Sequence, residues 1–258
     1  MGILQDILSS KRIEIARARR RKPLEDVKAD ALSQSGSSAF TQALKHKGVS
    51  IIAEIKRASP SRGVLTAEFD HRQLAREYEE GGARALSVVT DEKFFQGRPA
   101  FIQDVKKVCR LPVLRKDFII DEYQIYESKV LGADAMLLIV GNVDQHTFRR
   151  LYDCAGMLGL EVLVEAHTAK EVESANEMGA KIIGINNRDL ETFQVSIVHS
   201  LKLRDKISPG SIAVSESGIH TAEDIEQLQR ARFDAVLIGE GIVARKDRVE
   251  ALKAMVQA

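Results

Sequence analysis

A regular alternation of short apolar runs and amphipathic stretches restricts the fold of this chain more than any other feature of its sequence. Runs typical of buried strands begin near residues 49, 85, 112, 134, 160, 181, 211 and 234. Stretches with the apolar spacing of helices cover residues 71–80, 100–109, 122–131, 144–158, 169–178, 197–203, 222–231 and 248–256. Glycine recurs where a helix passes into the next strand, as at Gly82, Gly132 and Gly179, because helix C-termini favour a residue that tolerates left-handed dihedrals.

Strands that are each followed by a helix predict an α/β protein with a single (β/α)8 barrel, the TIM-barrel architecture. The composition does not change along the 258 residues, so we expect one domain, with an N-terminal helical extension over residues 1–48 and the barrel over residues 49–258. An open, doubly wound sheet is the alternative. It is disfavoured because the glycine-rich turn expected after its first strand is replaced here by Lys56-Arg57-Ala58-Ser59-Pro60-Ser61.

The extension is expected to begin with a helix over residues 2–22 that ends in a basic run, Arg19-Arg20-Arg21-Lys22. This run is open to two interpretations. It is either an anion-binding patch near an active site or a solvated helix end whose positive charge interacts favourably with the helix dipole.

Charge and composition exclude several classes of function. The net charge is +1, so no overall field favours nucleic acid or an anionic membrane as a partner, and a phosphorylated ligand needs a local site. The two cysteines, Cys109 and Cys154, lack metal-ligand spacing and cannot form a disulfide framework. No apolar stretch is long enough to span a bilayer, and the first residues lack the apolar core of a signal peptide. We therefore expect a cytoplasmic protein.

Charged and polar residues stand where several apolar strand runs end, namely Glu54, Lys56, Lys116, Glu165 and Asn186. Burying an unpaired charge costs several kcal/mol, and in a (β/α)8 barrel the C-terminal strand ends build the active site. Residues two apart share one face of a strand, so Glu54 with Lys56, and Lys116 with Phe118, can point into the same barrel mouth. The alternative at each position is a structural role, as a strand-end ion pair, a solvated charge or a loop hydrogen bond.

Glycine-containing turns follow the seventh and eighth strands, in Ser215-Glu216-Ser217-Gly218 and Gly239-Glu240-Gly241. Backbone N–H groups at these two turns are the usual phosphate site of the fold. The loop after the first strand adds Ser59, Ser61 and Arg62, and is expected to form a mobile basic lid over an anionic substrate.

Six motifs, taken in order along the chain, resemble the indole-3-glycerol-phosphate synthase family of tryptophan biosynthesis. They are AEIKRASPS (53–61), DEKFFQG (91–97), LRKDFI (114–119), LVEAH (163–167), INNRDL (185–190) and SESGI (215–219). The resemblance covers essentially the whole chain. It implies a carboxy-lyase that closes 1-(2-carboxyphenylamino)-1-deoxyribulose 5-phosphate to indole-3-glycerol phosphate, with loss of carbon dioxide and water.

The resemblance also implies catalytic roles. Lys116 would be the general acid that protonates the forming alkoxide, with a pKa lowered toward the working pH by nearby cations. Lys56 would hold the substrate carboxylate, although the two lysines divide the acid roles differently in some family mechanisms. Glu165 would be the base or charge stabiliser beside the anilino nitrogen, and Glu54, helped by Asn186, would act on the hydroxyl that leaves as water.

The other implied site residues bind the substrate. Phe95 and Phe118 would pack against its aromatic ring. The phosphate would lie among Ser59, Ser217, Gly218, Gly239 and Glu240, and Arg188 and Glu216 complete the implied set. Glu240 stands where some relatives have serine, and because a carboxylate repels phosphate, we expect this position to contribute its backbone N–H.

No metal or organic cofactor is implied, and the expected partner is a phosphorylated small molecule. We expect a monomer, and association with other tryptophan-pathway enzymes is left open. Two further functions compete with the synthase. One is a Schiff-base aldolase or phosphosugar isomerase with Lys116 as the nucleophile, and the other is a non-catalytic phosphate-binding protein of a biosynthetic complex.

Overall fold

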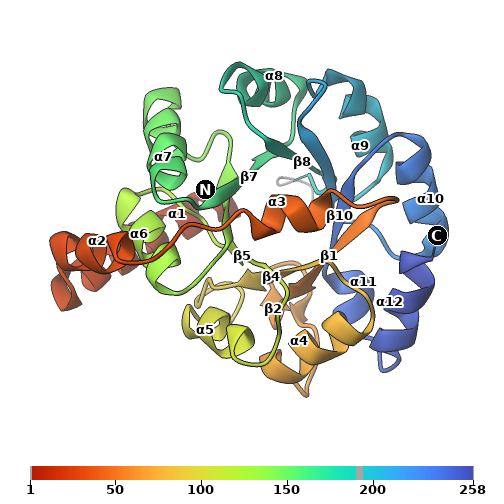
Figure 1. Ribbon diagram of the computed structural model, residues 1–258, viewed down its shortest axis with the longest axis horizontal. Helices are drawn as coiled ribbons and strands as arrows, with labels where there is room; N and C mark the ends of the chain where they lie inside the picture. The colour runs from red at the N-terminus through yellow and green to blue at the C-terminus, as the bar shows by residue number, and fades with distance from the viewer. Residues whose placement is uncertain (1, 190–193, 258) are drawn as a thin grey trace.

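A closed barrel of parallel strands lies at the centre of the computed structural model, which describes residues 2–189 and 194–257 (Figure 1). In chain order its strands are β1 (Ser50–Ile55), β4 (Ala85–Val89), β5 (Val113–Lys116), β6 (Ala135–Ile139), β7 (Glu161–Ala166), β8 (Ile182–Asn186), β9 (Ile212–Glu216) and β10 (Ala235–Ile238). Each strand pairs with the next one along the chain, and β10 pairs with β1. The predicted barrel is confirmed, and closure excludes the open, doubly wound sheet.

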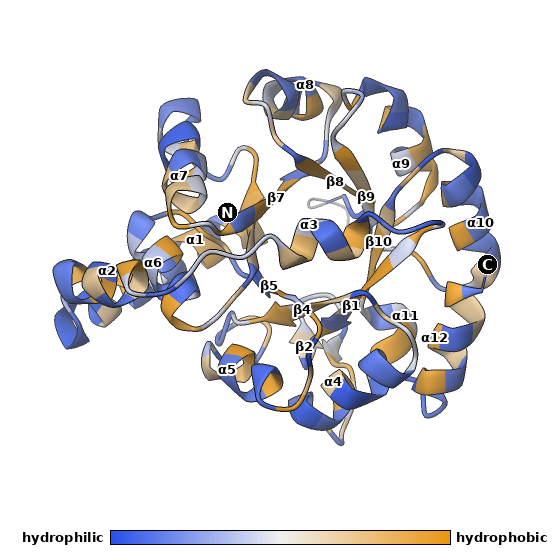
Figure 2. Ribbon diagram, in the orientation of Figure 1, coloured by the Kyte–Doolittle hydropathy of each residue, from blue (hydrophilic) through white to orange (hydrophobic). Residues whose placement is uncertain are grey.

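Helices surround the barrel and turn their apolar faces toward it (Figure 2). They are α4 (His71–Glu80), α5 (Ala100–Lys106), α6 (Glu122–Val130), α7 (Gln145–Met157), α8 (Ala169–Glu177), α9 (Val198–Leu203), α10 (Ala222–Arg230) and α12 (Arg248–Val256). Five of these helices have an N-cap residue whose side chain accepts a hydrogen bond from a backbone N–H of the first turn, which favours a helix start at that residue. The N-cap residues are Asp70, Asp121, Asp144, Thr168 and Thr221.

Some short elements were not predicted. The hairpin β2 (Ala58–Ser59) and β3 (Gly63–Val64) lies in the loop after β1, the 3-10 helix η1 (Arg204–Lys206) follows α9, and α11 (Glu240–Val243) follows β10. Segments of two to four residues are too short to show a periodic apolar pattern, so sequence periodicity cannot reveal them.

The end of the barrel where the strands begin is closed by apolar side chains. Over residues 2–49 the chain forms α1 (Ile3–Arg21), α2 (Leu24–Leu32) and α3 (Ala39–Leu44), and α3 lies across the barrel in Figure 1. Phe40 and Leu44 of α3 are fully buried against inward-facing residues of the barrel, among them Ile52, Leu114 and Ile182. Polar chemistry is thereby restricted to the opposite end, where the strands finish.

The basic end of α1 contacts neighbouring helices. Arg19 Nη2 lies 2.7 Å from Asp121 Oδ1 at the start of α6, and Lys22 pairs with Asp30 of α2. Tyr123 of α6 donates a hydrogen bond from its hydroxyl to the backbone oxygen of Lys22 at 3.2 Å. No helix within the two described ranges is long and apolar enough to cross a membrane.

Candidate active site

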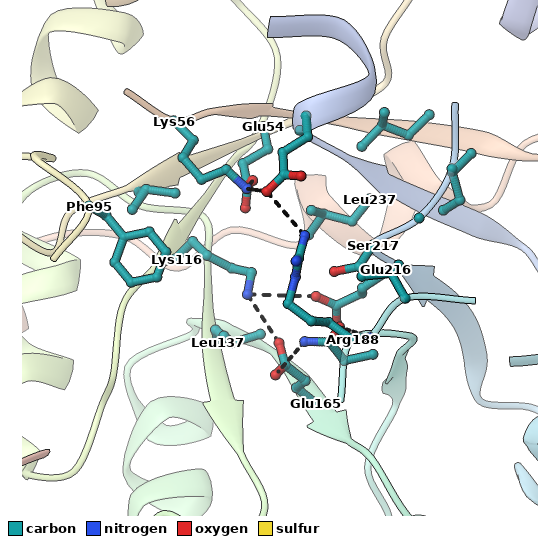
Figure 3. Close-up of a pocket in the computed structure, with 18 of the residues that line it drawn as sticks. Glu54, Lys56, Phe95, Lys116, Leu137, Glu165, Arg188, Glu216, Ser217 and Leu237 are labelled. Carbon is teal, nitrogen blue, oxygen red and sulfur yellow. Dashed lines mark hydrogen bonds and ion pairs between the residues drawn. The ribbon is translucent and has the colours of Figure 1, made fainter. Parts of the chain in front are cut away.

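A cavity of about 510 Å³ lies at the C-terminal ends of the barrel strands (Figure 3). Every strand of the barrel contributes to its wall, through Glu54 of β1, Val89 of β4, Lys116 of β5, Leu137 and Ile139 of β6, Glu165 of β7, Asn186 of β8, Glu216 of β9 and Leu237 of β10. Charged side chains from distant parts of the sequence therefore share one pocket, opposite the end that α3 closes.

Side-chain alternation along β5 explains how a lysine reaches the cavity. Leu114 packs in the apolar interior of the barrel, and Lys116, two residues later, points the same way into the cavity. The residue between them, Arg115, points outward, where its Nη1 donates a hydrogen bond to Ser128 Oγ of α6 at 3.1 Å. Arg115 and its neighbour Asp117 are 2% and 4% exposed. The Lys116 side chain is 19% exposed and pairs with Glu165, so the alternative of surface solvation at Lys116 is wrong.

At the centre of the cavity lies a group that we call the inner cluster, formed by Lys116, Glu165, Glu216 and Asn186. Lys116 Nζ is 3.0 Å from Glu165 Oε2 and 3.7 Å from Glu216 Oε2. Asn186 Nδ2 donates a hydrogen bond to Glu165 Oε1 at 3.1 Å. Because 3.7 Å is too long for a hydrogen bond, Glu216 Oε1 and Oε2 both lack a hydrogen-bond partner in the described structure.

The charges of the inner cluster shift its pKa values in different directions. Burial alone would lower the pKa of Lys116, but the carboxylates of Glu165, Glu216 and Glu54 outweigh it and raise that pKa above its usual value. Burial would raise the pKa of Glu165, yet Lys116 and His167 hold it below its usual range. Burial and the negative charge of Glu165 raise the pKa of Glu216 well above the ordinary value. The expected lowering of the Lys116 pKa is therefore wrong, since its close neighbours are carboxylates.

A glycine in β8 makes room for the unpartnered carboxyl group. A Cβ atom at Gly184 would lie 2.1 Å from Glu216 Oε1, far inside van der Waals contact. Any larger residue at this position would push the Glu216 side chain out of its place beside Lys116. The sequence analysis did not single out Gly184, because the contact joins two strands that are distant in sequence.

A second charged group lies beside the inner cluster and joins the ends of β1 and β10. Lys56 Nζ is 2.7 Å from Glu54 Oε2 (Figure 3). Arg188 Nη2 is 3.0 Å from Glu240 Oε1. Glu240 also lies 3.9 Å from Lys56 and 3.8 Å from Arg62. The Glu240 carboxylate therefore has three cations close to it, Arg188, Lys56 and Arg62. The sequence analysis did not predict these contacts.

Glycine is also required where β10 ends. A Cβ atom at Gly239 would lie 2.2 Å from Glu54 Oε2. At the end of the adjacent strand β9, Ser217 and Gly218 have φ values of 68° and 76°, which turn the backbone sharply at the cavity wall. Asn187 Nδ2 donates a hydrogen bond to the Ser217 backbone oxygen at 3.0 Å and so holds this turn. The two turns lie side by side at the mouth, as the predicted phosphate site requires.

Aromatic rings form another part of the wall. The ring centroids of Phe95 and Phe118 are 6.1 Å apart, and the ring planes are tilted by 38°. Both residues line the cavity, from the loops that follow β4 and β5. The faces of two such rings can contact a flat aromatic ligand.

Nearly all of the predicted site residues line this cavity. They are Lys116, Glu165, Lys56, Glu54, Asn186, Phe95, Phe118, Arg188, Glu216, Ser217, Gly218, Gly239 and Glu240. Ser59 is the exception, since within the described residues the wall of the cavity includes Ser61 and Arg62 but not Ser59. Ser59 is buried in β2, and its hydroxyl oxygen lies 3.5 Å from that of Ser61.

Four polar residues in or beside the cavity were not identified from the sequence. Asp91, Asp117 and His220 line the cavity wall, and His167 Nε2 lies 3.5 Å from Glu165 Oε1. Each follows the end of a barrel strand within four residues, and His167 is two residues after Glu165. That spacing was the available signal. Asn186, expected beside Glu54, instead donates to Glu165. Within the described ranges no group of three or more His, Cys, Asp or Glu side chains could hold a metal ion.

Comparison with known proteins shows one family over almost the whole chain. The family model described as "Indole-3-glycerol phosphate synthase" matches residues 4–255. A relative of that name from Chlorobium phaeobacteroides is 46% identical over 249 residues, which cover 96% of this chain and 96% of the relative. Another from Aromatoleum aromaticum is 42% identical and covers 98% of each chain.

Solved structures with low sequence identity share the barrel. The chain is similar to thiamine phosphate pyrophosphorylase from Pyrococcus furiosus, with a TM-score of 0.61 and 14% identity over 81% of this chain and 94% of that chain. It is also similar to 3-hexulose-6-phosphate synthase from Salmonella typhimurium, with a TM-score of 0.64 and 14% identity over 81% of this chain and 97% of that chain. At such identities the likeness concerns the fold alone.

Proposed function

This chain belongs to the indole-3-glycerol phosphate synthase family, and we propose that the inner cluster and the residues around it carry out the ring closure of that family. The reaction converts 1-(2-carboxyphenylamino)-1-deoxyribulose 5-phosphate to indole-3-glycerol phosphate, carbon dioxide and water. The contact of Lys116 with Glu165 inside the cavity is the observation that carries the proposed division of roles, because it places an acid and a base within 3.0 Å of each other.

Lys116 acts first, as the general acid. Its raised pKa keeps the ammonium group protonated at neutral pH, so it holds a proton ready for transfer. The ring carbon that bears the carboxylate attacks the ketone carbon, and Lys116 donates its proton to the ketone oxygen as the new carbon–carbon bond forms. The bond to the carboxylate then breaks, its electron pair returns to the ring, and carbon dioxide leaves.

Glu165 and the Glu54–Lys56 pair complete the reaction. The hydroxyl made in the first step leaves as water after it takes up a proton, which the Glu54–Lys56 pair supplies. Glu165, ionised because of its lowered pKa, stabilises the positive charge that develops on the ring system. It then accepts the proton from the carbon next to nitrogen, whose loss completes the indole. Asn186 holds the Glu165 carboxylate in place through its hydrogen bond.

Substrate binding divides between the two sides of the cavity. Phe95 and Phe118 contact the aromatic ring, and the turns at Ser217–Gly218 and Gly239 receive the phosphate. The positive groups of Lys56 and Arg188 face the substrate's anionic groups once these displace Glu240. The Schiff-base alternative loses support, because an amine nucleophile must be deprotonated and the carboxylates around Lys116 hold it in the charged form.

We also propose that the protein works as a monomer in the cytoplasm. The cavity wall draws on every strand of one barrel, so the proposed chemistry needs no residue from a second chain. Light scattering after size-exclusion chromatography would measure the mass in solution, and a stable dimer would contradict the monomer.

Activity is tested by mixing the purified protein with the carboxyphenylamino deoxyribulose phosphate and following indole fluorescence. The chain contains no tryptophan, so the background is low. We expect a signal proportional to protein concentration, and loss of most turnover in Glu165→Gln. Glu161→Gln is the matched control, since Glu161 begins the same strand at the closed end, where it accepts a hydrogen bond from the Thr41 N–H. Folded wild-type protein that binds the substrate but forms no indole would overturn the proposed function.

A further inference from the structure

Lys11, on the N-terminal helix α1, is buried although it lies outside the cavity. It is 3% exposed and shares the buried side of α1 with Ile7, Leu8 and Ile15. A lysine in this environment needs carboxylate partners, because desolvation of an unpaired ammonium group costs several kcal/mol.

The partners of Lys11 are the two aspartates of the cavity wall. Its Nζ lies 2.9 Å from Asp117 Oδ1 and 3.0 Å from Asp91 Oδ2, and Glu14 of α1 supplies a third contact at 2.7 Å. Burial alone would lower the pKa of Lys11, but Asp117 and Asp91 outweigh it and raise that pKa, so the ammonium form persists. Together with Arg115, these residues form what we call the outer cluster: Lys11, Asp91, Asp117 and Arg115.

Each aspartate also holds the backbone of an aromatic residue of the cavity. Asp91 Oδ1 accepts hydrogen bonds from the N–H groups of Phe94 at 2.8 Å and Phe95 at 3.2 Å. Asp117 Oδ1 accepts one from the N–H of Phe118 at 2.8 Å. The same two carboxylates therefore contact Lys11 and also hold the backbone at Phe95 and Phe118, and in Asp117 a single oxygen, Oδ1, makes both contacts.

Without Lys11, the two aspartates would keep one close cation. Asp91 and Asp117 are 1% and 4% exposed, and Asp117 retains Arg115 Nη2 at 3.2 Å and the Thr90 hydroxyl at 2.6 Å. Lys11 is the cation that lies 3.0 Å from Asp91 Oδ2. A buried carboxylate deprived of its cation must take up a proton or rotate toward water, and either change alters its hold on the Phe95 N–H.

We propose that Lys11 is a positioning residue, which fixes the separation of Phe95 and Phe118 through Asp91 and Asp117 and thereby sets the affinity for the aromatic ring of the substrate. This inference rests on the proposed function for the identity of the ligand. It assigns α1 a part in substrate recognition, although the helix lies outside the barrel. A lysine that only fastened α1 to the barrel would affect stability and leave ligand preference unchanged.

The test compares binding of two ligands to Lys11→Met. One is a non-reactive substrate analogue in which the ketone is reduced to an alcohol, followed by the fluorescence of its 2-aminobenzoate group. The other is inorganic phosphate, which lacks the ring. We expect the Kd of the analogue to rise about tenfold, while the Kd of phosphate changes less than about twofold. Lys22→Met is the control, since Lys22 lies at the exposed end of the same helix.

A double-variant cycle separates positioning from a general loss of structure. If Lys11 acts through the aromatic pair, its substitution should have little further effect on analogue binding in Phe95→Ala, whereas independent effects would add. Lys11→Arg, which restores the charge, should recover most of the affinity. If Lys11→Met does not fold, Lys11→Gln takes its place, because it keeps a hydrogen-bond donor without the charge.

The outcomes distinguish this inference from the proposed function. An unchanged analogue Kd in a folded Lys11 variant, or equal weakening of analogue and phosphate binding, would overturn the positioning role. A wild-type protein that binds the analogue tightly but makes no indole would overturn the proposed reaction alone. Binding of the analogue is measured without turnover, so the role of Lys11 is decided in either case.

Discussion

Arg115 and Lys116 are neighbours in β5, yet their side chains enter two buried charged clusters of different kinds. In the outer cluster, Asp91 and Asp117 share the two cations Lys11 and Arg115, and Glu14 and Glu127 each add a further carboxylate, at 2.7 Å from Lys11 and from Arg115. In the inner cluster, Lys116 faces Glu165 and Glu216, so one cation meets two carboxylates.

Hydrogen bonding separates the two clusters further. Arg115 donates to Thr90 Oγ1, the Gln124 backbone oxygen, Ser128 Oγ and Asp117 Oδ2, all between 3.1 and 3.2 Å. Both oxygens of Glu216, by contrast, have no hydrogen-bond partner in residues 2–189 and 194–257. A network in which each carboxylate has a close cation and at least one hydrogen-bond donor stabilises the fold, whereas a buried carboxyl group without a donor can bind or exchange a proton with a ligand. From this difference we infer that the charged residues on the outer face of β5 stabilise the fold and that those on its inner face take part in the reaction.

The most direct way to break this comparison is the pair of substitutions Lys116→Met and Arg115→Met, one residue apart. For Lys116→Met we expect kcat to fall about 100- to 10,000-fold, because the general acid is lost. The melting temperature should fall little, since the remaining carboxylates can share a proton. Steady-state kinetics by indole fluorescence and thermal unfolding measure the two effects. A folded Lys116→Met enzyme with near wild-type kcat would remove Lys116 from the acid role.

Arg115→Met should show the reverse pattern. Its removal leaves Asp117 and the partly buried Glu127 without the guanidinium group, which lies 3.2 and 2.7 Å from their carboxylates. The free energy of unfolding should fall by about 3–5 kcal/mol. Urea titration measures this loss. We expect kcat per folded molecule to change less than about tenfold, and a selective loss of kcat with unchanged stability would contradict the supporting role of the outer cluster.

The sequence predicted which residues of β5 face the cavity, but it did not predict which charged residues of the chain surround them. Alternation placed Lys116 and Phe118 on one face, and the strand–helix pattern identified the end at which they lie. The same pattern could not show that Lys11 is buried, because a lysine on a helix face looks the same whether carboxylates or water surround it. Nor could it show that Gly184 makes room for Glu216, since that contact depends on the register of β8 and β9.

Ser59 shows another limit of the sequence. A loop motif names the residues that a family uses, but the hairpin β2–β3 decides which of them face the cavity, and here Ser61 and Arg62 do so. The environment of Lys116 was likewise misjudged. Cations were expected around Lys116, but the side chains that surround it in the cavity are carboxylates, and strand alternation sends its neighbour Arg115 to the opposite face.

The two clusters should also differ in the sign of their pH dependence. The pKa of Glu216 is raised, so unfolding releases its proton once the pH exceeds the ordinary value of 4.5. The contribution of Glu216 to the free energy of unfolding is therefore fully present below that value and is lost as the pH rises through the folded-state pKa. The pKa of Asp117 is about 2; burial alone would raise it, but Lys11 and Arg115 lower it from 3.8. Its contribution, on the order of 2 kcal/mol, is present above pH 3.8 and is lost as the pH falls toward 2.

Glu216→Gln sharpens this difference. It removes a buried carboxyl group that lacks a hydrogen-bond partner within the described residues, so we expect unfolding at pH 8 to require about 1–2 kcal/mol more than in the wild type. The gain should shrink as the pH is lowered toward 4.5. Urea titrations at several pH values measure it. A variant that is less stable than the wild type at pH 8 would mean that the Glu216 charge is needed to balance Lys116.

The smallest effect is expected at Glu240, where the carboxylate faces the three cations Arg188, Arg62 and Lys56. It resembles the outer cluster in having cations on several sides, but it lies in the cavity, where the anionic substrate competes for the same groups. Glu240→Gln weakens the competing ion pairs, so we expect KM to fall about two- to fourfold at low salt with kcat unchanged, and the difference to diminish as added salt screens the charges. The control is Asp247→Asn. Asp247 pairs with Arg245 on the surface beyond α11, so this substitution removes one negative charge outside the cavity. A raised KM in Glu240→Gln would reverse the interpretation, because Glu240 would then belong with the supporting carboxylates, holding Arg188 in place for the substrate as Asp117 holds Phe118.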